Sequence, residues 1–98
     1  MSPIRRAEDY ANLKTLLEKQ ETFPHQYMHK FIGRNTAAFT VSVQAWEAQQ
    51  KRLKKKTERL SQGSNLIALT YIFEAHNADE IISLLQSTEL IDDVQIIL

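Results

Sequence analysis

Residues 65–85, NLIALTYIFEAHNADEIISLL, constrain the fold more than any other part of the chain. Their first half is rich in β-branched and aromatic residues and contains neither Gly nor Pro, which predicts a β-strand. Alternate side chains of a strand point to opposite faces. One face carries the large apolar residues Ile67, Leu69, Tyr71 and Phe73, and the other carries Leu66, Ala68, Thr70, Ile72 and Glu74. Apolar residues on both faces favour a central strand, with the large set facing the core.

A helix is predicted directly after this strand. Asn77 can act as N-cap, and Glu80, three residues later, occupies the capping-box position. Ile81, Leu84, Leu85 and Thr88 follow at helical spacing, so the helix should end near residues 87–89. Residues 94–98, VQIIL, then read as a C-terminal strand. A strand, a helix and a strand in one sheet imply a crossover connection.

Length, charge and cysteine content narrow the class of protein. The chain has 98 residues, enough for one domain with little spare stability, which dimerisation commonly supplements. Lys and Arg total 12, as do Asp and Glu, which argues against a general nucleic-acid or membrane binder but leaves a local patch possible. The absence of cysteine excludes disulfides and thiolate chemistry. No apolar run resembles a signal peptide or a membrane span, so we expect a cytoplasmic location.

The N-terminal part predicts an additional helix. Tyr10, Leu13, Leu16 and Leu17 trace one helical face. We therefore divide the chain into an N-terminal helix and connector, residues 1–22, and a domain, residues 23–98. The apolar stripe of this helix can pack on its own domain or dock on a second chain.

The middle of the chain leaves one choice open. Residues 25–32 read as a strand ending at Gly33, and Phe39, Val43 and Trp46 mark an amphipathic helix. The basic run KRLKKKTER, residues 51–59, can continue that helix to residue 60. Alternatively, residues 55–61 form a strand that Gly63 turns back onto the central strand. Sheet architecture favours the strand, because lysines commonly protect sheet edges.

With that strand, the elements after the first helix follow the order βαββαβ. This order is the signature of a ferredoxin-like arrangement. The predicted fold is therefore an α+β, ferredoxin-like βαββαβ sandwich with an additional N-terminal helix.

Residues 23–33, FPHQYMHKFIG, resemble the opening F-P-x-x-[FY]-x-x-K-[VF]-[IM]-G of the YbeD-like family of small bacterial proteins of unknown function. The resemblance resumes at Arg59 and runs to the C-terminus. It implies a ferredoxin-like sandwich related in shape to ACT regulatory domains, without enzyme activity and without a cofactor. The family usually has a Gly-x-Tyr-x-Ser pattern after the hairpin, where this chain has Leu66 and Ala68 in place of Tyr and Ser.

Catalytic and metal-binding motifs are not apparent. His25 and His29 have a spacing that could bind metal on a helix, but they fall on a predicted strand with no third ligand nearby. No serine sits beside a base and an acid, and the two glycines form no phosphate loop. We therefore predict no catalytic residues, no metal site and no cofactor.

Two surfaces remain as candidates. The first is the sheet face opposite the large apolar set, whose apolar residues predict the interface of a homodimer. Its residues are Met28, Lys30, Ile32, Ala68, Thr70 and Ile72. The alternative is that the N-terminal helix covers this face, within its own subunit or by exchange with a neighbour. The second is a phosphate-binding patch on the basic run. Its residues are Lys51, Arg52, Lys54, Lys55, Lys56 and Arg59.

These surfaces give two functional hypotheses. The first is a small non-enzymatic regulatory or interaction domain, ACT-like, that binds a partner protein or a small metabolite. The second is a nucleic-acid or phosphate binder that uses the basic run. Base stacking of the kind used by RNA-recognition modules is disfavoured, because the candidate interface carries no aromatic residue.

Overall fold

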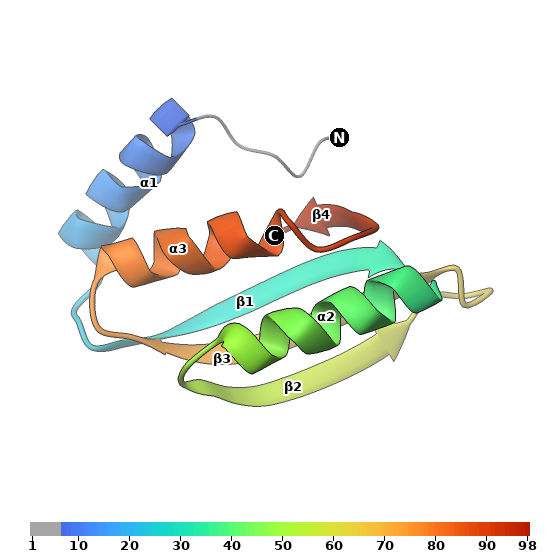
Figure 1. The fold of residues 1–98 in the computed structure, drawn as a ribbon. Helices are drawn as coiled ribbons and strands as arrows, with labels where there is room; N and C mark the ends of the chain where they lie inside the picture. The colour runs from blue at the N-terminus through green and yellow to red at the C-terminus, as the bar shows by residue number, and fades with distance from the viewer. Residues whose placement is uncertain (1–6) are drawn as a thin grey trace.

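The computed structural model describes residues 7–98, apart from the side chains of residues 7, 8 and 55, and shows a mixed α+β fold (Figure 1). The elements in chain order are α1 (Ala7–Gln20), β1 (His25–Arg34), α2 (Ala37–Gln49), β2 (Leu53–Leu60), β3 (Leu66–Ala75), α3 (Ala78–Thr88) and β4 (Val94–Ile97).

The described strands form one antiparallel sheet in the order β2-β3-β1-β4. β3 lies between two neighbours, which confirms the prediction of a central strand. β1 and β3 pair over their full lengths, from His25 opposite Ala75 to Arg34 opposite Leu66. β4 is short and pairs with β1 around Phe31–Gly33, so β1 is the second central strand over that part of its length.

The basic run forms an edge strand, so the prediction of a hairpin is confirmed and the helical alternative is wrong. β2 pairs with β3 from Leu53 opposite Phe73 to Leu60 opposite Ile67. The strand begins two residues earlier than predicted, because the chain reverses sharply at Arg52, which has a φ of 64°. The predicted turn contains Gly63 at φ 85° followed by Ser64 at φ 58°.

α2 and α3 cover one side of the sheet, and the core lies between these layers (Figure 1). The large apolar set of β3 is buried there, as its alternation predicted. Phe31 of β1 is fully buried, and its ring stacks on that of Tyr71 at a centroid distance of 5.8 Å. From α2, Phe39, Val43 and Trp46 complete the core. We call this the helical side of the sheet.

Both covering helices begin at capping residues. The Thr36 hydroxyl accepts a hydrogen bond from the Phe39 N–H, and the Asn77 side chain accepts one from the Glu80 N–H. The Glu80 carboxylate reaches back one residue further than a capping box requires and accepts the His76 N–H at 2.6 Å. These caps fix where each helix starts over the sheet.

The N-terminal helix lies on the helical side, which corrects one expectation. α1 packs against α3 (Figure 1), and its Leu13 and Leu17 pack against the common core. The Tyr10 hydroxyl donates a hydrogen bond to Glu89 at 2.5 Å. The expectation that α1 covers the opposite sheet face within its own subunit is wrong, because its apolar stripe finds its contacts beside α3.

Candidate functional site

The six residues predicted as an interface do share one face of the sheet. The register sets Met28 opposite Ile72, Lys30 opposite Thr70 and Ile32 opposite Ala68, and directly opposite residues of antiparallel strands point to the same face. This face is opposite the helical side, and we call it the open face. No described helix packs on it.

The open face carries two apolar pairs, Met28 with Ile72 and Ile32 with Ala68, on either side of the polar pair formed by Lys30 and Thr70. Met28 has an exposed fraction of 65%, and Ile32, Ala68 and Ile72 are part-exposed. Sequence reasoning missed Ile96, a part-exposed residue of β4 that pairs with Ile32 and extends the apolar surface. Its alternation within the C-terminal strand could have suggested a face, but the register against β1 was needed to choose which one.

Charged residues are distributed unevenly over the open face. Lys30, Arg34 and Arg59 are exposed on the open face. Glu74 lies at the other end of β3, where its carboxylate is 2.8 Å from the Lys54 ammonium and 3.5 Å from the His76 ring. The hydrogen bond and the charge of Lys54 lower the pKa of Glu74, so this carboxylate is ionised at neutral pH.

The basic run is divided rather than gathered into one patch. The Arg52 guanidinium binds Glu80 at 2.6 Å and Lys54 binds Glu74, so both lie near the start of α3. Lys56 instead reaches Glu47 of α2 at 3.3 Å. Lys51 and Arg59 are exposed, and the side chain of Lys55 lies outside the described residues. Three of the six predicted cations are therefore paired with carboxylates of other elements.

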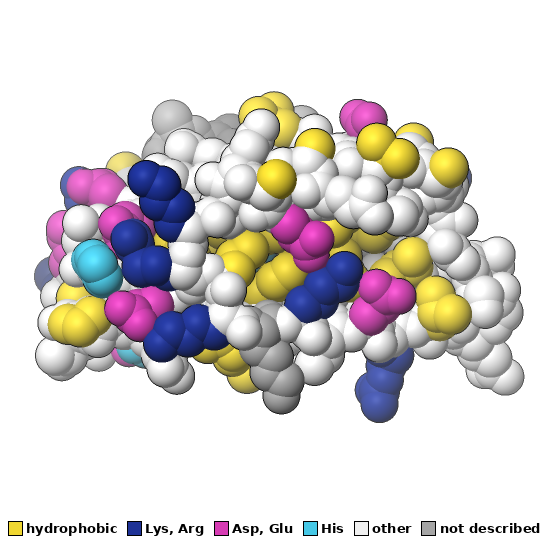
Figure 2. All heavy atoms as spheres, turned by 60° about the horizontal axis from the view of Figure 1, so that its bottom comes forward, with side chains coloured by type: hydrophobic (Ala, Val, Ile, Leu, Met, Phe, Trp, Pro, Cys, Tyr) yellow, Lys and Arg dark blue, Asp and Glu magenta, His cyan; other side chains and the backbone are white. Residues whose placement is uncertain are grey.

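A groove between α2 and β2 was not predicted. Figure 2 shows hydrophobic side chains in a hollow across the middle of the molecule, with basic and acidic side chains lying over it. A cavity of about 370 Å³ occupies one part of this groove. Its lining residues are Glu47, Gln50, Arg52, Leu53, Lys54, Lys56 and Tyr71. A smaller cavity of about 50 Å³ lies on the other side of Lys56, lined by Phe39, Val43, Ile67 and Leu69 among others.

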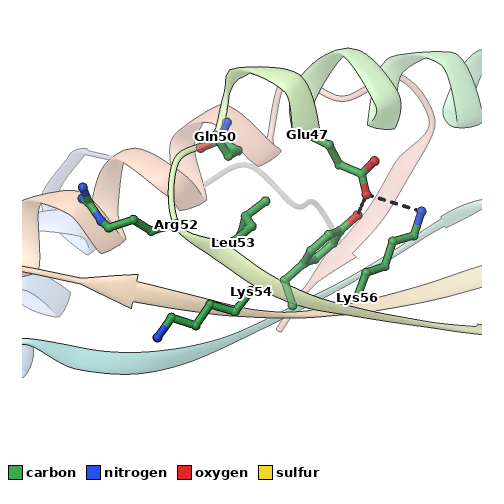
Figure 3. A pocket seen from close by; sticks show the side chains of 7 residues that line it. Glu47, Gln50, Arg52, Leu53, Lys54 and Lys56 are labelled. Carbon is green, nitrogen blue, oxygen red and sulfur yellow. Dashed lines mark hydrogen bonds and ion pairs between the residues drawn. The ribbon is translucent and has the colours of Figure 1, made fainter.

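A three-residue bridge separates the two cavities. The Tyr71 hydroxyl donates to Glu47 at 2.6 Å, and the same carboxylate oxygen is 3.3 Å from the Lys56 ammonium (Figure 3). Burial and the hydrogen bond to Glu47 raise the pKa of Tyr71 above its ordinary value of 10.0, so the phenol remains protonated. Figure 3 shows Leu53 pointing towards α2 and Lys54 pointing away from the cavity. The three bridge residues are far apart in sequence, and no motif signals their meeting.

The histidines lie in separate places. The buried His29 is 2.9 Å from the Thr88 hydroxyl through Nε2, whereas the His25 ring is 3.4 Å from Glu21. The part of the chain that the structure describes contains no group of three or more His, Cys, Asp or Glu residues placed to hold a metal ion. Among these residues, no helix combines the length and the apolar composition that a membrane span requires.

Comparisons of the chain with protein-family models, with curated proteins and with solved structures gave no match.

Proposed function

We propose that this protein is a small, non-enzymatic, cytoplasmic interaction domain that works by association through the open face. The order of its elements after α1 and the strand order β2-β3-β1-β4 support the ferredoxin-like, ACT-like interpretation of the fold. An interaction role drawn from a fold is analogy, so the argument rests on the surface itself.

The single observation that carries the proposal is that the two apolar pairs of the open face are uncovered. α1 was the one other element expected to cover them, and α1 packs beside α3 instead. Met28 exposes 65% of its surface, and Ile72 lies opposite it in the register. Exposed apolar side chains gathered on one face of a domain are typical of a protein–protein interface.

The occupant that we propose is a second copy of the chain, because one orientation makes the face complementary to itself. Glu74 lies at one end of the open face, and Arg34 lies at the other end, opposite Leu66. A two-fold axis that lies in the interface and runs across the strands sets each Glu74 over the Arg34 end of the other copy. Met28 and Ile72 of one copy then meet Ile32 and Ala68 of the other. The two copies of Lys30 lie near the axis, and their flexible stems can carry the ammonium groups outward to water. A metabolite at this subunit interface is compatible with the arrangement.

Phosphate or nucleic-acid binding through the basic run is less well supported. Arg52, Lys54 and Lys56 already hold carboxylates at 2.6–3.3 Å, which reduces the positive field that a phosphate would meet. The paired cations also lie over different parts of the molecule.

The proposal is tested by measuring the mass of the protein in solution by sedimentation equilibrium over a range of concentrations. The wild type is expected to sediment as a dimer, and Ile72→Lys as a monomer, because the substitution places one unpaired charge per copy among the apolar side chains that meet in the dimer. Val41→Lys is the matched control, since Val41 is an exposed apolar residue of α2, away from the open face, with an exposed fraction of 64%.

A wild type that remains monomeric at all concentrations contradicts self-association. Equal loss of the dimer in Ile72→Lys and Val41→Lys contradicts the choice of face. Circular dichroism melting of each variant checks that the lysine has not unfolded the domain.

A further inference from the structure

We propose that the outer edge of β2, together with the groove between α2 and β2, binds an extended acidic segment of a partner protein as an added strand. The inference concerns a different surface from the open face and does not depend on self-association. It rests on four observations: an unpaired strand edge, a cavity beside it that Leu53 and Tyr71 line among charged and polar residues, the charge of the strand, and the direction of its backbone groups.

β2 is an edge strand of the described sheet, and it pairs with β3 without interruption from Lys55 to Leu60, after a register shift between Leu53 and Lys55. Its other edge has no strand neighbour among residues 7–98. A strand edge of this length presents a row of backbone donors and acceptors that a further strand can pair with. Binding by strand addition uses such an edge for affinity and adjacent pockets for specificity.

The direction of the backbone groups follows from the hairpin. The Ser61 N–H donates to the Leu66 carbonyl at 2.9 Å, which makes these two residues a hydrogen-bonded pair. Hydrogen-bonded and non-hydrogen-bonded pairs alternate along an antiparallel ladder. Lys56, Glu58 and Leu60 therefore turn their N–H and C=O groups outward, towards the free edge.

The groove gives this edge a place for apolar side chains. Lys56 and Glu58 pair with Tyr71 and Leu69, so their side chains lie on the helical side, next to the groove. An added strand would send alternate side chains to the same side, above the cavity of about 370 Å³ that Leu53 and Tyr71 line. Leu53 and Tyr71 give this cavity its apolar surface among charged and polar side chains, and its volume accommodates a large aliphatic side chain.

The charge of β2 indicates which kind of segment binds at this edge. The β2 sequence LKKKTERL contains four basic residues and one acidic residue, and Lys54 and Lys56 are paired with Glu74 and Glu47, so the positive charge that a partner meets is smaller than this count. A second copy of β2 would bring like charges together, which disfavours a continuous sheet made by two such edges. A segment rich in glutamate or aspartate is attracted instead, and Arg59 is exposed on the open-face side to meet its carboxylates. The segment that fits alternates apolar residues with acidic ones.

The test uses a fluorescein-labelled synthetic peptide of alternating valine and glutamate, long enough to span β2. The control peptide replaces each glutamate with lysine. Fluorescence anisotropy of the full-length protein is expected to show saturable binding of the acidic peptide that weakens with added salt, and no binding of the basic one. Amide chemical shifts should change along β2 and the facing side of α2.

Two substitutions at one position separate backbone pairing from side-chain effects. Glu58→Pro removes an outward N–H while leaving the bonds to β3, and proline is tolerated at strand edges. It is expected to weaken binding of the acidic peptide about tenfold or more. Glu58→Ala keeps the N–H and removes the one carboxylate of β2, so it should bind the peptide at least as tightly as the wild type.

Equal binding of the acidic and basic peptides would overturn the choice of partner. Shift changes confined to the open face, or unchanged affinity in a folded Glu58→Pro, would overturn the choice of edge. If Glu58→Pro melts early, the shift map of the wild type decides: changes along β2 support the proposal, and their absence at saturating peptide rejects it.

Discussion

The two sides of β3 differ in what covers them, although both carry apolar residues. On the helical side, Leu69 and Tyr71 each have an exposed fraction of 2%, beneath α2 and α3. On the open face, Ala68 and Ile72 remain part-exposed. The difference teaches that apolar character alone does not mark the core of this domain. The larger side chains of the strand face the helices, and the smaller and mixed set is left for another contact.

The largest effect is expected from truncating the helical side of β3. Phe73→Ala should lower the free energy of unfolding by about 3–5 kcal/mol, because it leaves a cavity where a buried aromatic ring stood. Ile72→Ala, the neighbouring truncation on the open face, should cost much less in the monomer. Urea unfolding of both variants checks the comparison, and equal losses would show that the two sides are buried to a similar degree.

A second substitution tests how closely α2 approaches the sheet. A Cβ placed on Gly33 of β1 would lie 2.0 Å from the ring of Phe39. Gly33→Ala should therefore destabilise the domain by about 1–3 kcal/mol, the usual cost of overpacking. The double variant Gly33→Ala with Phe39→Leu should lose less than the sum of the two single changes, as thermal melting can measure. Strict additivity would mean that the ring moves aside freely.

The sequence predicted the strand faces, the hairpin and the helix starts, because these depend on local periodicity and turn residues. The alternation of β3 identified its buried side, and Gly63 marked the turn that makes residues 53–60 a strand. The six residues of the predicted interface also share a face. The position of α1 could not be predicted, because an amphipathic stripe shows that a helix buries one side and does not show against what.

The unpredicted parts of the candidate sites depend on contacts between distant residues. Ile96 joins the open face through a register that the spacing of β4 does not specify. The Lys56–Glu47 pair and the cavity beside it exist because β2 lies under one side of α2. The sequence predicted that the strand ends at Gly33, whereas β1 continues to Arg34, and the closeness of Gly33 to Phe39 could not be predicted. Neither the charge pattern nor the periodicity of the sequence predicts these contacts.

Tyr71→Phe tests the groove between α2 and β2, where Tyr71 lines a cavity on the helical side of the sheet. The change removes the hydroxyl that donates to Glu47 at 2.6 Å and leaves the ring in the core. The expected loss is about 1 kcal/mol, as for one hydrogen bond to a part-buried carboxylate. Chemical denaturation measures it. The double variant Tyr71→Phe with Glu47→Ala should lose less than the sum, because both changes remove the same hydrogen bond, and a simple sum would show that this hydrogen bond contributes nothing.

The smallest effects are expected from substitutions at two glutamates. Glu80 lies in the first turn of α3, on the helical side, and Glu74 lies near the end of β3, on the open face. Glu80 accepts the His76 N–H and pairs with Arg52, and these contacts lower its pKa below the ordinary 4.5. Lys54 and His76 lower the pKa of Glu74 on the open face. A carboxylate with a lowered folded-state pKa contributes stability above its unfolded pKa and loses it as the pH falls through the folded pKa. Wild-type stability should therefore decline below about pH 4.5.

Glu80→Gln should cost about 0.2–1 kcal/mol at neutral pH, as for a solvent-accessible ion pair, and it should flatten the decline in acid. The amide oxygen of Gln can still accept the His76 N–H, so what is lost is the charge that holds Arg52 at 2.6 Å. Glu74→Gln should have the smaller effect at neutral pH, because its contacts join side chains in solvent and tie no helix to the sheet. Melting temperatures of the three proteins at neutral pH and near pH 4 measure both claims. A larger loss in Glu74→Gln than in Glu80→Gln would reverse the comparison, and it would mean that the open face depends on its charged end more than the helical side does.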